Sequence, residues 1–595
     1  MFADPHTRVF ASVPRARVRA STRAMDASNL GPRFVSLKLK KRNVLINSFS
    51  VMHPNGRHRR PRHQIAVRIT LTGRRASKSR HCVRARARAV TMGVDVDGDG
   101  AAAEARAHVA LAVPATLASL CNRARDLISL GFVGADAATT ATLAGAALAS
   151  TIANVTGNAV VVGLVSALVT LGGQAYGEGR GGEAWAWAQR ALACCAATSA
   201  ATAIGWRFVE DGLLAWNFDA AIARSCAAYL RGLRPGLFAY AANACAQAWL
   251  QAQGSTRPVA CAGVAATVLH APVCLCFRRM GFGAVGPAYA TSVSTSLVFA
   301  ANATYARLRR NRNGWFRERD EALAERRDAC ASRVCFKTMF DREGLVLFLK
   351  LGVPGVLLMS EWWASEFIVL AAGKLRNPSV AISAMSIYQA TNAFAFMVAV
   401  GFGAATATRV SNEVGAKDAS RAKLAASVAL RLIVVVEVAV SATVYLSRER
   451  WGAAFTSDHD VRALVSKLMV PLAFYVFFDA VCCVSTSVLR GAGRQAFATP
   501  IVLFAYYVVG LPLSAWLAYK GYGAMGLAIG GVVGTATHAG IMTRVALCID
   551  WPTEIARSKH IRGASAFDDD DDLASRLLVD VAADDELGNG VDALI

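Results

Sequence analysis

Long apolar runs recur along most of this chain and limit its fold more than any other feature. Between residues 108 and 548, stretches rich in Ala, Val, Leu, Gly and Ser repeat, each close to the roughly 20 residues that a helix needs to cross a bilayer. With 54% hydrophobic and 18% charged residues, the 595-residue chain is too apolar for a soluble protein. We therefore expect an all-α polytopic membrane protein with about twelve transmembrane helices.

The two halves of the apolar region resemble each other. LAVP at residues 111–114 returns as LGVP at 351–354, and MGFGAVGPAYA at 280–290 returns as KGYGAMGLAIG at 520–530, both 240 residues later. AYGEG around Gly177 pairs with EVGAK around Gly415 at an offset of 238. Six spans per half make the repeat parallel, a layout of secondary transporters whose sites lie between two lobes. The sequence thus predicts two pseudo-symmetric six-helix lobes, at residues 107–306 and 345–550.

The net charge of +24 is concentrated outside the lobes. Residues 1–90 hold 22 Lys and Arg against two acids. We expect residues 1–106 to be a disordered extension, either a transit peptide, a retained basic arm, or an artefact of a start at Met92. It has almost no aromatic residues, which argues against nucleic-acid binding. The basic connection 307–344 should be cytoplasmic, and residues 551–595, with five consecutive aspartates, should be a disordered acidic tail.

Acidic residues interrupt the apolar runs of the second half. Glu361 and Glu366 lie within residues 350–373, and Asp479 lies in the tenth span. An acid near the middle of a span costs roughly 2.5–3.5 kcal/mol on insertion scales, and the usual reason for it is an ion, proton or substrate pathway. The alternative is a carboxyl group that only hydrogen-bonds to a neighbouring helix. Glu361 and Glu366 differ by roughly 140° around a helix, so we expect only one to face a narrow pathway.

The repeat separates these acids. It places Asp126 of the first span opposite Glu366, which favours a structural pair with Arg123 or Arg125 as partners. Glu361 and Asp479 have no acidic counterpart, which suits an asymmetric functional role. The histidines in or near spans, His270 and His538, are expected to be packing residues. No Cys or His set has the sequence spacing of a metal site, and no phosphate-binding loop or nucleophile elbow is present.

Five stretches carry a resemblance to a known family. They are SLGFVG at 129–134, the run from 147 to 179, EWWASE at 361–366, TRVSNEVGAKD at 408–418 and VLRGAGRQ at 488–495. Over residues 109–546 the chain resembles the multidrug and toxic compound extrusion (MATE) family, specifically its plant-type, DETOXIFICATION-like branch. The resemblance implies a two-lobe antiporter, not an enzyme, that expels organic compounds in exchange for protons or sodium.

Candidate residues follow from the pattern and the resemblance together. Cation coupling is assigned to Glu361 and Asp479, with Glu366 secondary. The candidate residues of the substrate pocket are Trp362, Tyr388, Gln389, Asn392 and Tyr475. The candidate structural or gating residues are Asp126, Asn154, Gln174, Pro114 and Pro354. Val169 stands where relatives commonly have an acid, which weakens a coupling role for the first lobe. The segment 389–392 also departs from the family pattern, which leaves the substrate class open.

The sequence therefore predicts a proton-coupled exporter of small organic or xenobiotic compounds that works by alternating access. Its expected partners are the bilayer, a small organic substrate and protons, without cofactor, metal or nucleic acid, and as a monomer. The open alternatives are sodium coupling, an organic-anion carrier, a flippase of lipid-linked precursors, and a non-transporting sensor or scaffold. The expected location is the vacuolar or plasma membrane, or the plastid envelope if the extension is a transit peptide.

Overall fold

The computed structural model describes residues 37–38, 44–49, 66–71, 99–136, 140–313, 336–375 and 377–563. The chain divides into two compact units, Met1–Asp97 and Gly98–Ile595. The first unit contains an antiparallel sheet of order β1-β2-β3, formed by Leu37–Lys38, Val44–Phe49 and Ala66–Leu71. The rest of the predicted N-terminal extension up to residue 98, and the tail after residue 563, lie outside the described residues.

The first lobe is built from six spans. Their elements are α2 (Asp99–Asp136); α3 (Thr140–Ala153), the π-helical turn η1 (Asn154–Asn158) and α4 (Ala159–Gly177); α5 (Gly181–Gly205) with the short α6 (Val209–Ala215); α7 (Ala220–Ala252); α8 (Arg257–Arg279); and η2 (Gly283–Val285) with α9 (Gly286–Asn313). The first helix begins at Asp99, eight residues before the expected start of the lobe at residue 107.

The second lobe repeats this order. Its elements are α11 (Phe336–Met339), α12 (Arg342–Leu358) and α13 (Ser360–Ala372); α14 (Pro378–Gly415); α15 (Ala419–Trp451) with η3 (Gly452–Ala454); α16 (His459–Ala492); α17 (Gln495–Leu503), η4 (Phe504–Gly510), α18 (Leu511–Leu517) and η5 (Ala518–Tyr522); and α19 (Gly523–Leu547). A further helix, α20 (Trp551–Gly563), follows. The acidic tail is therefore helical at its start, which corrects the prediction of disorder from residue 551.

The number of spans agrees with the prediction. Among the described residues, seven helical runs are long and apolar enough to cross a membrane alone, and the bent pair α5–α6 makes an eighth. One of the seven runs, Gln495–Leu547, contains two spans, because Gly521 and Gly523 turn the chain with φ values of 98° and 57°. With the more polar α2, α7 and α9, this makes twelve spans.

The internal repeat is visible in the backbone. Gly281 and Gly283, the repeat counterparts of Gly521 and Gly523, also have positive φ values, of 82° and 53°. A residue with a Cβ is strained in this region, so both turns need glycine for the same reason. The repeated turn therefore sits between the last two spans of each lobe, as the 240-residue offset requires.

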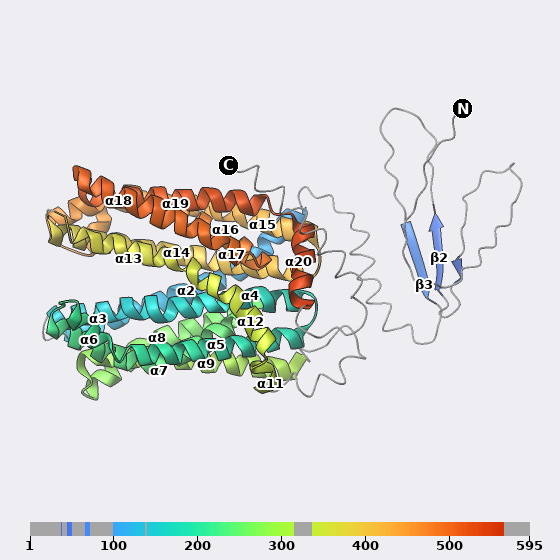
Figure 1. The fold of residues 1–595 in the computed structure, drawn as a ribbon, viewed down its shortest axis with the longest axis horizontal. Helices are drawn as coiled ribbons and strands as arrows, with labels where there is room; N and C mark the ends of the chain where they lie inside the picture. The colour runs from blue at the N-terminus through green and yellow to red at the C-terminus, as the bar shows by residue number, and fades with distance from the viewer. Residues whose placement is uncertain are drawn as a thin grey trace, which may run out of the picture. The chain divides into compact units, whose positions relative to one another are not determined.

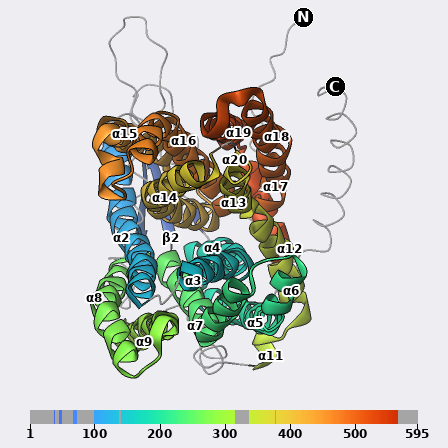
Figure 2. The same cartoon turned by 90° about the vertical axis from the view of Figure 1, so that its left-hand side faces the viewer.

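The first span of each lobe packs in part against the core of the other lobe. Figure 1 shows the lobes as two layers of roughly parallel helices, and Figure 2 shows α2 and α12 at the boundary between them. Ala112 of α2 packs in the core of the second lobe. Phe348 and Leu351 of α12 pack in the core of the first lobe, with Trp187 and Leu168. The first span of each lobe in the chain order therefore also contributes to the core of the other lobe.

The lobes meet tightly where α4 and α14 end, which we call the closed end (Gln174–Gly177, Arg409–Gly415 and Glu104). A Cβ added at Gly177 would lie 2.0 Å from the Asn412 carbonyl oxygen, and one at Gly415 would lie 2.1 Å from the Gln174 carbonyl oxygen. Gly177 corresponds to Gly415 in the repeat, and Gln174 corresponds to Asn412. The contact is therefore a pseudo-two-fold one, in which the same surface of each lobe meets its counterpart.

Polar contacts reinforce the closed end. Arg409 of α14 binds both carboxylate oxygens of Glu104, at 2.8 and 2.7 Å, and its own helix neighbour Glu413 at 2.9 Å. Ser558 of α20 donates a hydrogen bond to the Gln174 side chain at 2.8 Å. Helix α20 is itself held because Glu554 pairs with Arg494 and Arg557. These contacts tie both lobes and α20 together at one end of the bundle.

Candidate functional site

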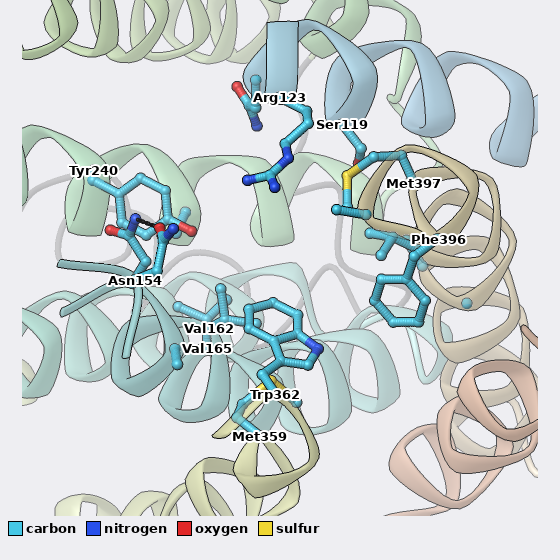
Figure 3. A pocket seen from close by; sticks show the side chains of 18 of the residues that line it. Ser119, Arg123, Asn154, Val162, Val165, Tyr240, Met359, Trp362, Phe396 and Met397 are labelled. Atoms are coloured by element: carbon cyan, nitrogen blue, oxygen red, sulfur yellow. Dashed lines mark hydrogen bonds between the residues drawn. The ribbon is translucent and has the colours of Figure 1, made fainter. Parts of the chain in front are cut away.

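A cavity of about 520 Å³ lies between the lobes. It is lined by α2, η1, α4, α7 and α9 of the first lobe and by α13, α14, α16 and α19 of the second. Figure 3 shows Arg123 entering from one side and Trp362 from the opposite side, with Phe396 and Met397 beside them. The cavity therefore has walls from both lobes, as the repeat predicts for a transporter site.

Glu361 lies in the first turn of α13, where the seventh span is broken at Met359. Its carboxylate is 13% exposed and lies 3.5 Å from Nδ1 of His538 in α19, which is 1% exposed. The same His538 nitrogen lies 3.5 Å from the Tyr506 hydroxyl. His538 is thus more than a packing residue, because it is the polar neighbour of the cavity acid.

Asp479 of α16 reaches the same cavity from another helix. It is 6% exposed, and the side chain of Asn392 on α14 is its polar neighbour. The Cys482 thiol donates to the Asp479 backbone carbonyl at 3.0 Å. Among the described residues, no Lys or Arg lies within 4.0 Å of the Glu361 or Asp479 carboxylate; Arg490, also on the cavity wall, acts on Glu361 from farther away.

Glu366 also lines the cavity, on the same helix as Glu361. The prediction that only one of these two acids faces the pathway is therefore wrong. It assumed a narrow pathway, whereas the cavity is wide enough to receive both faces of α13. Asp126 lines the opposite wall, and its carboxylate lies 3.9 Å from Nη1 of Arg123. The predicted partnership of Asp126 with an arginine of its own helix is present.

The candidate pocket residues divide into two groups. Trp362, Gln389, Asn392 and Tyr475 line the cavity. Gln389 donates to the Ser365 hydroxyl at 3.1 Å, and Trp362 meets Phe396 edge-to-face with ring centroids 6.4 Å apart. Tyr388 is buried behind the wall, where its ring meets Tyr475 at 6.3 Å. Tyr388 therefore supports the wall instead of forming it.

The candidate structural residues lie mostly away from the cavity. Asn154 lines it, at the start of the π-helical turn η1. Gln174 belongs to the closed end and donates to the Gly491 carbonyl at 3.2 Å. Pro114 and Pro354 lie inside α2 and α12, the two spans that cross between lobes, and the Pro354 carbonyl accepts a hydrogen bond from Thr499 at 3.2 Å.

Glu437, a buried acid inside an apolar run, was also missed in the sequence. Glu437 in α15 is 0% exposed, and neither carboxylate oxygen has a hydrogen-bond partner among the described residues. It interrupts the apolar run LRLIVVVEVAVSATVY, so the criterion that selected Glu361 and Asp479 would have found it. Burial of an unpartnered carboxyl group is costly unless the group is neutral. Glu437 therefore extends the acidic character of the second lobe beyond the cavity wall.

Three side chains near the acids could also attract a metal ion. They belong to Glu361, Cys482 and His538, which offer a carboxylate oxygen, a thiol sulfur and an imidazole nitrogen. These three atoms all lie within 4.8 Å of one another. Sequence spacing could not show this group, because its members come from α13, α16 and α19. The thiol hydrogen is directed at the Asp479 carbonyl. We therefore treat the group as the polar surroundings of Glu361.

Fold and cavity together define the class of protein: a polytopic helical membrane protein with two six-span lobes around a shared cavity, as in secondary transporters. The MatE family model matches residues 114–276 and 355–516, one segment in each lobe. The chain belongs to this family, the multidrug and toxic compound extrusion transporters.

Relatives place the chain in the plant-type branch. Protein DETOXIFICATION 16 of Arabidopsis thaliana is 31% identical over 466 residues, which cover 77% of this chain and 91% of that protein. Protein DETOXIFICATION 17 of the same plant is 32% identical over 78% of this chain and 93% of its own length. The crystal structure of the eukaryotic MATE transporter AtDTX14 matches with a TM-score of 0.71 and 27% identity, covering 78% of this chain and 99% of that one. The resemblance seen in the sequence is confirmed.

Proposed function

We propose that this protein exports small organic molecules in exchange for protons, by alternating access of its two lobes. The observation that carries the proposal is the pair of acids Glu361 and Asp479, which line the interlobe cavity and have no Lys or Arg at ion-pair distance among the described residues. A carboxylate without a counter-charge is costly in such a place, and a proton removes that cost. The acids can therefore exchange a proton with whichever side the cavity opens to.

The surroundings of Glu361 favour a proton over sodium. Hard cations such as sodium prefer several oxygen ligands, whereas the side chains grouped with Glu361 offer an imidazole nitrogen and a thiol sulfur. His538 lies 3.5 Å from the carboxylate and can stabilise either protonation state by donating or accepting. Tyr506, next to His538, extends this chain of titratable groups away from the cavity.

The closed end supplies the element that alternating access requires. The lobes meet there through backbone atoms of Gly177 and Gly415 and through the polar contacts of Arg409 and Gln174, all of which a rotation of the lobes would break. The cavity between the lobes would then open at the end that is closed in this structure. Protonation of Glu361 and Asp479 from the acidic side would favour release of substrate, and loss of the protons on the other side would restore the pocket.

The test is gradient-driven uptake into proteoliposomes with an acidic interior. Two probes of opposite charge, tetraphenylphosphonium and 2-naphthoate, cover either substrate class. We expect accumulation of at least one probe, its collapse by an uncoupler, and its loss in Glu361→Gln. Glu343→Gln is the matched control, because Glu343 is an exposed acid in the first turn of α12.

Three results would overturn the proposal. They are full-rate accumulation by Glu361→Gln, accumulation driven by a sodium gradient with no pH difference, and no accumulation of either probe by the wild-type chain. Accumulation driven by a sodium gradient would mean that the protein is a transporter coupled to sodium instead of protons. The Glu343→Gln control separates loss of coupling from a general effect of removing an acid from the second lobe.

A further inference from the structure

The wall of the cavity that belongs to the first lobe carries an excess of positive charge. Arg123 and Arg125 of α2 both line it, and Asp126 is the one acid that they share there. We propose that this wall binds the anionic group of the substrate, a carboxylate, sulfate or phosphate attached to an aromatic body. This inference names the substrate class of the site described above and so rests on the proposed function.

Arg125 is the first reason. Its side chain is 6% exposed, so a full positive charge is buried in the wall of a transporter cavity. Nη2 donates to the Asn122 side-chain oxygen, while Nη1 has no hydrogen-bond partner in the part of the chain that the structure describes. A buried guanidinium with an unused donor is unfavourable unless a counter-charge compensates it. Asp126 acts on it but is half exposed to the cavity and lies beside Arg123.

Arg123 is the second reason. Its side chain points into the cavity from α2 (Figure 3). The distance of 3.9 Å from its Nη1 to the Asp126 carboxylate is too long for a hydrogen bond, so the planar donor face of the guanidinium remains available. Glu366 of the opposite wall attracts Arg123 but lies beyond ion-pair distance. A guanidinium with this geometry matches the two oxygens of a carboxylate or phosphate.

Neutral donors surround the arginines. Asn158 donates from its Nδ2 to the Asn154 Oδ1 at 2.9 Å, which leaves the Asn154 amide hydrogens for another acceptor. Both residues belong to the π-helical turn η1, and such turns are frequent at functional sites. Tyr240 of α7 lies beside Asn154 in the cavity wall and carries a further hydroxyl donor (Figure 3).

Aromatic and apolar side chains face this polar group. Trp362 of α13 and Phe396 and Met397 of α14 line the cavity opposite and beside Arg123 (Figure 3). A ligand with an anionic head on α2 would therefore place its body against Trp362, where an aromatic ring gains stacking contacts. The acids Glu361 and Asp479 lie on the second-lobe wall and would repel a second anionic group. The favoured ligand thus has one anionic end and one aromatic end.

The experiment measures binding to the purified full-length protein in nanodiscs, with no gradient present. Tritiated 2-naphthoate is displaced by unlabelled 2-naphthoate, by the neutral 2-naphthamide and by the cationic 2-naphthylmethylammonium. Hydrogen bonds to charged groups contribute enough that 2-naphthoate should bind roughly ten- to a hundredfold tighter than 2-naphthamide. Arg123→Gln should reduce this preference, because only Arg125 remains to bind the carboxylate, and should leave the affinity for 2-naphthamide unchanged.

Two further variants keep the test decisive. Arg224→Gln is the matched control, because Arg224 is an exposed arginine of α7, away from the cavity lining, and donates to the Ala220 carbonyl of its own helix. Arg123→Lys keeps the charge and loses the planar fork, so its preference should fall between wild type and Arg123→Gln. If Arg123→Gln fails to fold, the graded loss in Arg123→Lys carries the result.

The proposal is overturned by equal affinity for the three probes, by tightest binding of 2-naphthylmethylammonium, or by no binding of 2-naphthoate. It is also overturned if Arg123→Gln or Arg123→Lys keeps the full carboxylate preference. Because the assay contains no gradient, a failure of proton coupling would leave its outcome unchanged. Conversely, if the carboxylate preference is absent, the proposed function can still be tested, because the transport assay also uses the cation tetraphenylphosphonium.

Discussion

Adding one methyl group at the closed end should shift the balance between the two orientations of the lobes. In Gly415→Ala, the new Cβ would lie 2.1 Å from the Gln174 carbonyl oxygen. A carbon and a carbonyl oxygen normally come no closer than about 3.3 Å, so the lobes must separate by about 1 Å. Both atoms belong to helix backbones, so no side chain can turn aside. Gly415 has an ordinary helical φ, so alanine itself causes no strain there.

The expected magnitude follows from the cost of overpacking. Inserting a methyl group into a close contact typically costs about 1–3 kcal/mol. That cost falls only on the conformation in which the closed end is closed, so the equilibrium should move roughly 5- to 150-fold toward the other. By the pseudo-two-fold, Gly177→Ala should produce the same shift, since its Cβ would lie 2.0 Å from the Asn412 carbonyl oxygen.

The assay is a distance distribution between spin labels at Tyr176 and Ser420, both exposed and on opposite lobes at the closed end. The label background replaces Cys261, Cys276 and Cys548, the exposed cysteines among the described residues, with serine, and likewise Cys82, Cys330 and Cys335, which lie outside the described residues. We expect a longer population in Gly415→Ala. Gly540→Ala is the control, because nothing lies within 4 Å of a Cβ there. A wild-type distribution in folded Gly415→Ala would refute the argument.

Three other perturbations test particular contacts. Glu437→Met removes an unpartnered buried carboxyl group and should raise the melting temperature by about 2–4 °C per kcal/mol gained, as measured by scanning fluorimetry; a lower melting temperature would show that the acid is structurally needed. Glu104→Gln removes the ion pair of Arg409 with α2 and leaves its ion pair with Glu413. The distribution of distances between the spin labels at Tyr176 and Ser420 should therefore become broader. Ser558→Ala removes the donor to the Gln174 side-chain oxygen, a loss of about 1–3 kcal/mol, and should speed hydrogen exchange in α20; unchanged exchange would mean that the other contacts of α20, such as the ion pairs of Glu554, are enough to hold that helix.

The fold could be predicted because a bilayer imposes simple rules on sequence. The length of the apolar runs predicted the membrane spans. The fixed offset between Gly281 and Gly521 predicted the internal repeat and the turn that each half contains. The cost of buried charge identified Glu361 and Asp479 in the same way, since only a few acids interrupt the apolar runs. These signals are local, so they can be recognised before any helix is placed beside another.

The rest depended on which helices face each other. His538 lies beside Glu361 only because α19 packs against α13, and nothing around His538 in the sequence indicates that neighbour. The width of the cavity was equally hidden, so the angular argument placed Glu366 wrongly. Arg123 and Arg125 were read as partners for acids of their own helix, and their place on the cavity wall became apparent only once both lobes were assembled.

Symmetry in the contacts and asymmetry in the charges have different physical origins. Surfaces that must close and separate repeatedly favour small residues, and both lobes present one at the equivalent position of the closed end, Gly177 and Gly415. The charges lack such a constraint, because each additional buried charge adds a desolvation cost. Glu361 and Asp479 on the second-lobe wall, and Arg123 and Arg125 on the first-lobe wall, let a single cavity hold protons and an anionic group at separate places. Divergence of the two halves should therefore be greatest at the cavity and least at the closed end, which is where Gly177 and Gly415 have remained the same residue.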